Sequence, residues 1–208
     1  MEGATVPIAP NIIAWLDLFG IAVFAASGAL AAAQRGQTLV TFSFFALVTG
    51  VGGGTVRDLL IGAPVFWVQD WRFAATCLIT AGLVWFTPKN VWNPRARDWF
   101  DAVGIAIYAV FGAWKSLTLG VPFLPAMMMG VITACVGGII RDMLAGEPSI
   151  LLKPEIYVTA AALASALFVL LVWLETPVLL AAIISASAGF CLRAMAIWKG
   201  WAIPSYKM

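Results

Sequence analysis

The sequence contains no histidine, and it lacks the short motifs that mark the common enzyme chemistries. Without histidine, a G-x-S-x-G nucleophile elbow or a phosphate-binding Walker loop, the usual acid–base, nucleophilic and phosphoryl-transfer sites lack their parts. The three cysteines, Cys77, Cys135 and Cys191, lie singly in apolar runs without C-x-x-C spacing, which argues against a zinc site. We therefore expect no enzyme activity, no cofactor and no resident metal.

Charge is also scarce. Only 11% of the 208 residues are charged and 62% are hydrophobic, against about 25% and roughly 45–50% in soluble domains. The net charge of +2 is too small for a nucleic-acid-binding surface, and the basic residues lie at the ends of apolar runs. A chain of this length cannot bury so much apolar surface in water, so residues 1–208 are expected to form a single all-α integral membrane domain.

The apolar runs predict seven transmembrane helices, since about 20 apolar residues span a bilayer. Their expected ranges are 11–33, 38–61, 72–88, 97–119, 122–145, 155–174 and 177–198. Tryptophans gather near the ends of these runs, as they do at membrane interfaces. Basic residues outside the runs fall mainly on one side: Arg35, Lys89, Arg95, Arg97, Lys153, Lys199 and Lys207, against Arg72 alone on the other. This bias predicts a multi-pass protein of the cell membrane with its N-terminus outside and its C-terminus in the cytoplasm.

The sequence repeats itself at an offset of 84 residues. DLFGIAVFAASGA (17–29) aligns with DAVGIAIYAVFGA (101–113), and VGGGTVRDLLIGAP (51–64) aligns with CVGGIIRDMLAGEP (135–148). From Asp17 to Pro64, 16 of 48 positions are identical without a gap. We expect a first three-helix repeat over 11–96, a second over 97–176, and a seventh helix with a cytoplasmic tail over 177–208. An odd number of spans per repeat inverts the second copy, an arrangement known from transport proteins.

Clustered glycines precede an Arg-Asp pair in both repeats. They are Gly52, Gly53 and Gly54 in the first copy and Gly137 and Gly138 in the second. Adjacent glycines weaken a helix, and in lipid a broken helix is tolerated only where its backbone is buried in protein or lines a watery cavity. We expect a break or kink at these positions that lines a path for a solute. The alternative is that the glycines only let helices pack closely.

Six charged residues of the repeat lie inside predicted helices, where charges are expensive and mark routes for ions or substrates. Neighbours on a helix point apart, so Arg57 and Asp58 are not expected to pair with each other. We predict two ion pairs between helices, Asp17 with Arg57 and Asp101 with Arg141. Asp58 and Asp142 would then be free to face water. The alternative is that all six charges are structural.

Lys115 lies inside the fourth predicted helix, and its counterpart in the first repeat is Ala31. The repeat therefore does not explain this charge. It could act as a gate or anion contact in the path, or it could extend to a lipid headgroup.

The duplicated Gly-Gly-x-x-Arg-Asp segments and the D-x-x-G-I-A openings resemble those of the trimeric intracellular cation channels, the TRIC family, in its prokaryotic branch. The resemblance covers essentially the whole chain. It implies a homotrimer in the membrane, an ion path through each protomer lined by kinked second and fifth helices, and permeation of K⁺ and to some extent Na⁺. It also implies that Lys115 matches a family lysine associated with the closed state. A bound lipid is possible but is not identified.

These features favour a passive K⁺ channel with Gly52, Gly53, Gly54, Asp58, Gly137, Gly138, Asp142 and Lys115 along the path. The competing hypothesis is a secondary transporter of a small solute such as glycine, because inverted repeats with broken helices are equally typical of transporters. A membrane scaffold without transport is a third possibility, but it leaves the glycines and the duplicated charges without a role.

Overall fold

The computed structural model describes residues 10–204, with side chains from Trp15 onward, and this part of the chain is helical. The main helices are α1 (Pro10–Gln34), α2 (Leu39–Leu60), α4 (Trp71–Phe86), α5 (Ala96–Thr118), α6 (Phe123–Leu144), α7 (Val158–Trp173) and α8 (Val178–Lys199). They match the seven predicted helices. The short helix α3 (Phe66–Gln69) and the 3₁₀ turns η1 (Lys89–Val91) and η2 (Ile150–Leu152) were not predicted.

Five of the helices are long and apolar enough to cross a bilayer, whereas α4 and α7 are apolar but have 16 residues each. Exposed tryptophans lie at helix ends: Trp71 begins α4, Trp173 ends α7 and Trp198 precedes the last residue of α8. This is where the headgroup region of a bilayer would contact them. The basic residue Lys207 lies outside the described residues.

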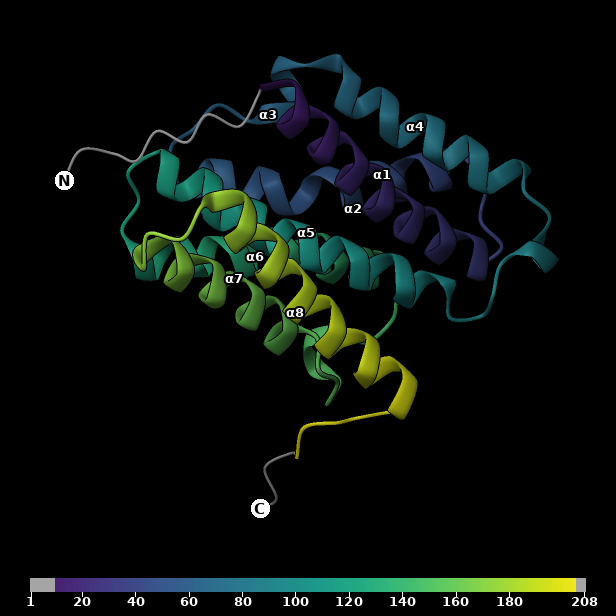
Figure 1. Ribbon diagram of the computed structural model, residues 1–208. Helices are drawn as coiled ribbons and strands as arrows, with labels where there is room; N and C mark the ends of the chain where they lie inside the picture. Colours follow the sequence, from purple (N-terminus) through teal and green to yellow (C-terminus); the bar gives the residue numbers. More distant parts are fainter. Residues whose placement is uncertain (1–9, 205–208) are drawn as a thin grey trace.

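The helices form two groups that correspond to the two sequence repeats (Figure 1). In the first group α1 packs against α2 and α4, and in the second α5 packs against α6 and α7. The groups meet where α2 packs on α6 and α1 on α5, while α8 lies against α5 and α7. Because the joining helices are α1, α2, α5 and α6, the residues most similar between the repeats face each other in the middle of the molecule.

The contacts across this interface are reciprocal at the offset of 84 residues. Gly53 lies against the carbonyl oxygen of Thr133, and Gly137 lies against that of Thr49. The rings of Phe24 and Tyr108, which are repeat equivalents, stack with centroids 5.4 Å apart. In the same way Gly20 faces the ring of Tyr108, and Gly104 faces that of Phe24. These exchanges relate the two halves by an approximate twofold symmetry.

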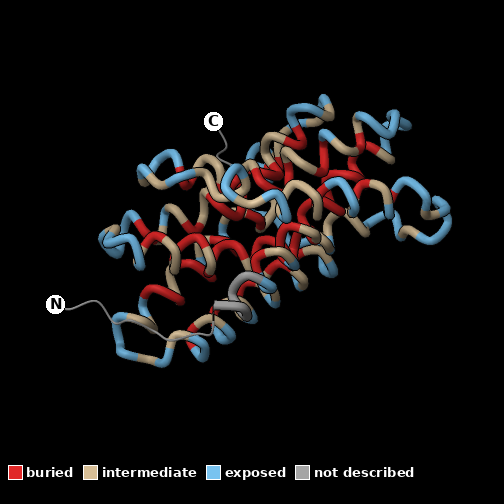
Figure 2. The backbone as a smooth tube through the Cα atoms, turned by 90° about the horizontal axis from the view of Figure 1, so that it is seen from above, coloured by how far each residue is buried: buried red, intermediate tan, exposed pale blue. Residues whose placement is uncertain are grey.

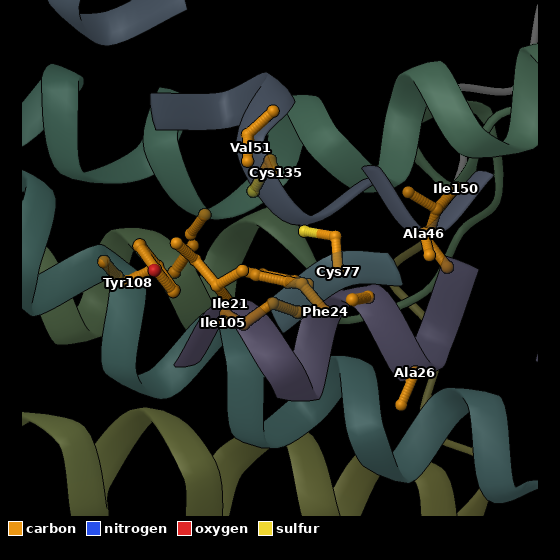
Figure 3. Packing of buried hydrophobic residues seen from close by; sticks show 14 of the residues in the cluster. Ile21, Phe24, Ala26, Ala46, Val51, Cys77, Ile105, Tyr108, Cys135 and Ile150 are labelled. Atoms are coloured by element: carbon orange, nitrogen blue, oxygen red, sulfur yellow. The ribbon is translucent and has the colours of Figure 1, made fainter. Parts of the chain in front are cut away.

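The buried residues lie mainly inside the helical bundle and the exposed ones at its ends and loops (Figure 2), and many of the buried residues are alanines and other small side chains. Ile21 and Ile105, again 84 residues apart, are both fully buried and lie side by side with Phe24 and Tyr108 in Figure 3. Larger apolar side chains such as Phe86 and Leu152 are exposed. An apolar exterior around a small-residue core is the arrangement expected when lipid, not water, surrounds the helices.

The turns that end the helices are also repeated. Gly36 and Gly120 follow the first helix of each group with φ of 63° and 79°, and Gly62 and Gly146 follow the second with φ of 68° and 66°. Glycine occupies this left-handed region without the steric penalty of a side chain. The identical turns place the loops after α2 and α6 in equivalent positions, which becomes important for the charged residues described below.

The predicted break in the second and fifth helices is wrong for this conformation. α2 is one uninterrupted helix through Gly52, Gly53 and Gly54, and α6 is one through Gly137 and Gly138. The glycines instead serve close helix packing, the alternative named above. Because they have no side chains, the backbones of α2 and α6 can touch. Both helices keep their internal backbone hydrogen bonds through these positions, so a break is not needed to accommodate the glycines.

This contact predicts opposite effects for two neighbouring substitutions. A methyl group at Gly53 would overlap the Thr133 carbonyl, whereas one at Gly52 would meet Ile140 Cδ1 at 3.5 Å, an ordinary contact. Gly53→Ala should destabilise the protein by about 1–3 kcal/mol through overpacking. Gly52→Ala, the matched control, should be neutral or slightly stabilising because alanine favours the helix. Thermal unfolding in detergent measures both, and equal melting temperatures would contradict the close-packing interpretation.

Candidate functional site

Two carboxylates, Asp58 and Asp142, lie buried near the ends of α2 and α6 and make the same contacts in each repeat. One oxygen of Asp58 accepts a hydrogen bond from the Phe66 amide at 3.1 Å, and one oxygen of Asp142 accepts from the Ile150 amide at 2.9 Å. Both bonds reach eight residues forward. Each carboxylate therefore holds the loop that follows its helix.

The second oxygen of each carboxylate pairs with the arginine that precedes it. Nε of Arg57 donates to Asp58 at 2.9 Å, and Nε of Arg141 donates to Asp142 at 2.9 Å. The prediction that these neighbours do not pair is therefore wrong. The Cβ directions diverge as expected, but the long arginine side chain bends back because its buried guanidinium needs an acceptor.

The prediction that Asp58 and Asp142 are free to face water is also wrong. The two residues are 0% and 2% exposed, and each accepts hydrogen bonds at both carboxylate oxygens. In this conformation they are structural anchors. Either carboxylate could contact an ion only after its ion pair with the preceding arginine had separated.

Lys115 belongs to the Asp58 cluster. From α5, in the other repeat, its Nζ donates to the two Asp58 oxygens at 2.9 and 3.1 Å. Its side chain is 22% exposed, whereas Asp58 is fully enclosed. Lys115 therefore covers the Asp58 carboxylate from the more open side and links α5 to the end of α2.

The predicted ion pair between Asp17 and Arg57 is not formed among the described residues. Asp17 instead accepts a hydrogen bond from the Tyr108 hydroxyl at 2.6 Å. Arg57 pairs with Asp58 and lies over the rings of Phe66 and Phe111, at 5.9 and 5.6 Å from their centroids. With Asp58 as partner and two aromatic faces around it, the Arg57 guanidinium does not turn toward Asp17.

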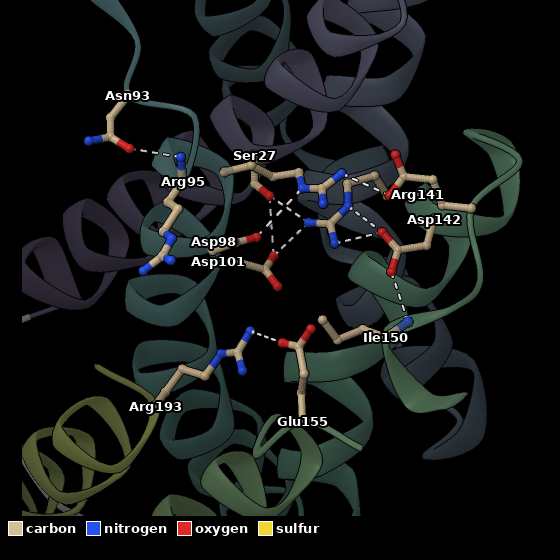
Figure 4. A network of polar contacts seen from close by, with 12 residues as sticks. Ser27, Asn93, Arg95, Asp98, Asp101, Arg141, Asp142, Ile150, Glu155 and Arg193 are labelled. Carbon is tan, nitrogen blue, oxygen red and sulfur yellow. Dashed lines mark hydrogen bonds and ion pairs between the residues drawn. The ribbon is translucent and has the colours of Figure 1, made fainter. Parts of the chain in front are cut away.

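The equivalent ion pair in the second repeat is present (Figure 4). Nη1 of Arg141 lies 2.8 Å from Asp101 and 2.5 Å from the hydroxyl of Ser27, and that hydroxyl also lies 3.2 Å from Asp101. Arg141 thus holds two carboxylates, Asp101 and Asp142, at once. Ser27 corresponds to Phe111 in the repeat, so a hydroxyl stands here where the first cluster has an aromatic ring.

The two clusters consequently differ in charge. The first joins Arg57 and Lys115 to Asp58, and the second joins Arg141 to Asp101 and Asp142. Counting only directly paired groups, the first carries one excess positive charge and the second one excess negative charge. Lys115, Tyr108 and Phe111, which contribute to this difference, are among the positions at which the repeats diverge. Sequence reasoning missed Tyr108 and Ser27, although the mismatch of a tyrosine with a phenylalanine in aligned buried positions was a visible signal.

Four of the five glycines predicted to line a path are buried in packing contacts, and Gly52 is half-buried. Gly53, Gly54, Gly137 and Gly138 are buried, and Gly54 faces the ring of Phe66. Phe66 also contacts Lys115, whose Nζ is 5.7 Å from the ring centroid. The glycine contacts and the charged contacts therefore form one continuous packed region. No group of three metal-ligating side chains occurs within the described part of the chain.

A third polar contact joins the repeats at the end of the bundle nearest the basic loops. Glu147, in the loop after α6, lies 3.2 Å from Arg35 and 3.0 Å from Arg97. Arg35 belongs to the turn after α1, and Arg97 to the start of α5. Partial burial alone would raise the pKa of Glu147, but the charges of Arg97 and Arg35 and their hydrogen bonds outweigh it and lower that pKa.

Fold and site together define a helical membrane protein with a duplicated core and buried charge clusters. Comparison with known proteins identifies the family to which it belongs. The sequence model of the family described as "Glycine transporter" matches residues 14–89 and again 98–173, two segments offset by the same 84 residues.

Similar proteins come from several bacteria. A UPF0126 membrane protein of Vibrio cholerae is 40% identical over 72% of this chain, and the match spans 64% of that protein. A UPF0126 inner membrane protein of Escherichia coli K12 is 41% identical over 72% of this chain and 73% of its own length. The crystal structure of a TRIC trimeric intracellular cation channel orthologue from Rhodobacter sphaeroides aligns with a TM-score of 0.84 and 39% identity, covering 92% of this chain and all of that one. The chain belongs to the prokaryotic branch of the TRIC family, a multi-pass family of the membrane.

The asymmetry of the clusters predicts unequal effects of equivalent substitutions. Asp101→Asn leaves Arg141 neutralised by Asp142 but removes its charged contact with Asp101, and should destabilise the protein by about 1.5–3 kcal/mol. Asp17→Asn, its repeat equivalent, keeps an acceptor for the Tyr108 hydroxyl and should cost about 1 kcal/mol. Thermal unfolding of the two purified variants tests this difference. A loss for Asp17→Asn as large as that for Asp101→Asn would show that Asp17 does neutralise a buried charge.

The Glu147 contact predicts a pH dependence of stability. Because its pKa is lowered in the folded state, Glu147 stabilises the fold above its ordinary pKa of 4.5, and this contribution is lost as the pH falls below it. Glu147→Gln should lower stability by up to about 1 kcal/mol at pH 7, since the partner Arg35 is partly exposed. The difference from wild type should shrink as the pH falls below 4.5 and disappear once Glu147 is protonated in the folded state. Glu175→Gln, in the exposed turn after α7, is the control and should not alter the pH profile.

Proposed function

We propose that this protein is a passive channel for monovalent cations, K⁺ foremost, with one path through each protomer of a homotrimer. The observation that supports this most directly is the match in fold and sequence to the Rhodobacter sphaeroides channel, at 39% identity over its full length. Family membership alone does not give selectivity. Potassium and the trimer are therefore part of the proposal, as is the seven-span inverted topology with the N-terminus outside.

The proposed path runs between α2 and α6, where the two repeats meet. Its acidic groups are Asp58 and Asp142, and carboxylate and backbone oxygens can replace part of the hydration shell of a cation. In the conformation described here this path is closed. Lys115 covers Asp58, and Gly53 and Gly137 hold the two helices in contact.

Opening would separate Lys115 from Asp58 and loosen the glycine contacts. We propose that α2 and α6 bend at Gly52–Gly54 and Gly137–Gly138 when this happens, because glycine lowers the helical propensity there by about 1 kcal/mol per residue. The kinked, path-lining helices implied by the family resemblance would then be a property of the open state. The uninterrupted, packed helices would be a property of the closed state.

A secondary transporter of a small solute such as glycine is the second candidate. The description of the matching family favours it, and an inverted repeat with buried charges suits alternating access as well as a channel. A channel conducts many ions in one opening, whereas a transporter moves a solute in a saturable cycle. The two candidates therefore differ in an electrical measurement.

The deciding experiment is a recording from purified protein in a planar bilayer under a KCl gradient. We expect discrete unitary currents that reverse near the K⁺ equilibrium potential. A silent bilayer, together with saturable glycine uptake into liposomes, would instead establish the transporter. Silence in both assays, with the assembly intact by size-exclusion chromatography, would exclude both functions.

Lys115→Gln tests the proposed gate in the same recordings. We expect the ion pair between Lys115 and Asp58 to stabilise the closed state by about 1.4 kcal/mol relative to the open state. Its loss should therefore raise the ratio of open to closed channels about tenfold. Lys89→Gln, an exposed lysine in the loop after α4, is the matched control and should leave gating unchanged. An unchanged open probability in Lys115→Gln would remove Lys115 from the gate without contradicting the channel itself.

A further inference from the structure

A small charged cavity lies at the end of the bundle where α5 begins and α8 ends. Its volume is about 230 Å³, below the range of roughly 300–1,000 Å³ that is common for drug-sized ligands. Arg95, Asp98, Glu155, Arg193 and Trp201 are among the residues that line it. None of them belongs to the two carboxylate clusters between α2 and α6, so the cavity is separate from the proposed ion path.

The walls of the cavity are fixed by the backbone. Gly200 ends α8 in the left-handed conformation, with φ of 67°, and turns the chain back. The following segment then pairs with the loop before α7: Glu155 and Ala202 form an antiparallel bridge, and the Ile203 amide donates to the Pro154 carbonyl at 2.7 Å. The cavity is thus built by paired segments and does not depend on the position of one flexible side chain.

Arg193 is the buried charge at this site, with a side chain that is 2% exposed. Its two terminal nitrogens donate to Glu155 at 2.9 Å and to the Ile156 carbonyl at 3.2 Å, as part of the network in Figure 4. Its Nε has no hydrogen-bond partner among the described residues. The charge of Arg193 beside the cavity is therefore only partly satisfied by hydrogen bonds.

The other charged residues of the cavity also have unused capacity. Arg95 is exposed and makes one side-chain hydrogen bond, to the Ile197 carbonyl at 3.3 Å. Asp98 forms an ion pair with Arg97, but the two groups are 3.7 Å apart, too far for a hydrogen bond. Two guanidinium groups and two carboxylates therefore face one small space. A simple anion would meet the carboxylates and a simple cation the guanidinium groups, whereas a zwitterion would complement both.

We propose that this cavity binds the headgroup of a zwitterionic aminophospholipid of the phosphatidylethanolamine class. The phosphate would lie toward Arg95 and Arg193, and the primary ammonium would lie toward Asp98 and Glu155. The cavity is at the end of two apolar helices, and Trp198 and Trp201 beside it are 76% and 41% exposed. Exposed tryptophan and lysine at a helix end are typical of the headgroup layer, which favours a lipid over a free amino acid.

Native mass spectrometry of the delipidated protein tests this. The purified trimer or monomer, as it elutes, is incubated with equal concentrations of phosphatidylethanolamine, phosphatidylcholine or phosphatidylglycerol carrying the same acyl chains. Phosphatidylcholine keeps both charges but lacks N–H donors, and phosphatidylglycerol lacks the ammonium. We expect at least fivefold more phosphatidylethanolamine adduct than adduct of either other lipid.

Three variants test whether phosphatidylethanolamine binds in this cavity. Arg95→Gln and Asp98→Asn should each reduce the phosphatidylethanolamine adduct at least fivefold, and both should elute like wild type because these side chains are not in the core. Arg72→Gln removes an arginine that is paired with Asp70 on α4, away from the cavity, and should keep the adduct. Arg193 is not substituted because it is a buried charge whose loss would compromise folding.

Each other outcome would overturn the proposal in a defined way. Equal binding of phosphatidylglycerol or phosphatidylcholine would show that the primary ammonium is not recognised. An unchanged adduct in Arg95→Gln and Asp98→Asn would place the lipid elsewhere on the surface. Displacement of the lipid by millimolar free phosphoethanolamine or glycine, with binding of that compound, would assign the cavity to a soluble zwitterion instead of a lipid.

Discussion

The structure depends on a buried carboxylate that performs two tasks at the end of one helix in each repeat. Asp58 and Asp142 neutralise the preceding arginine with one oxygen and hold the amide eight residues ahead with the other. A charge in this setting is stable only while both sides of it are satisfied. The position of the loop after α2 or α6 is therefore coupled to the ionic contacts between helices. Movement of either loop removes one of the hydrogen bonds that stabilise the buried carboxylate.

The two repeats place equivalent charged sites at the ends of α2 and α6, and three of the positions at which the repeats differ lie in contact with them. Lys115 stands where the first repeat has Ala31, Tyr108 where it has Phe24, and Phe111 where it has Ser27. In the second cluster the arginine is fully engaged by two carboxylates, which makes that half rigid. In the first cluster Asp58 is shared between Arg57 and Lys115, and Lys115 is partly exposed. The first cluster is thus the half in which a contact can be exchanged without exposing a buried arginine.

Much of the fold could be predicted from the sequence because the lipid environment imposes simple rules. The seven apolar runs, the 84-residue repeat and the family motifs were sufficient for the helices and the family. The pairing of the charges could not be predicted in the same way. Arg57 with Asp58 was rejected on the direction of Cβ atoms, but the outcome depends on where a long side chain finds an acceptor in a dry interior. Asp17 turned to Tyr108, a partner from the other repeat whose hydroxyl has no counterpart at Phe24.

The glycines show why a motif can indicate function and still be misread in structure. The same lack of side chains that permits a kink also permits two helices to touch, and the touching arrangement is the one adopted here, at Gly53 with Thr133 and at Gly137 with Thr49. These contacts are reciprocal, so α2 cannot leave α6 at one of them without weakening the other. An uninterrupted helix keeps its own backbone hydrogen bonds when it leaves its neighbour, so backbone groups would meet water only where the helix also bends at the glycines. Under the proposed channel function, the same glycines would hold the closed state by close packing and would permit the bend of the open state.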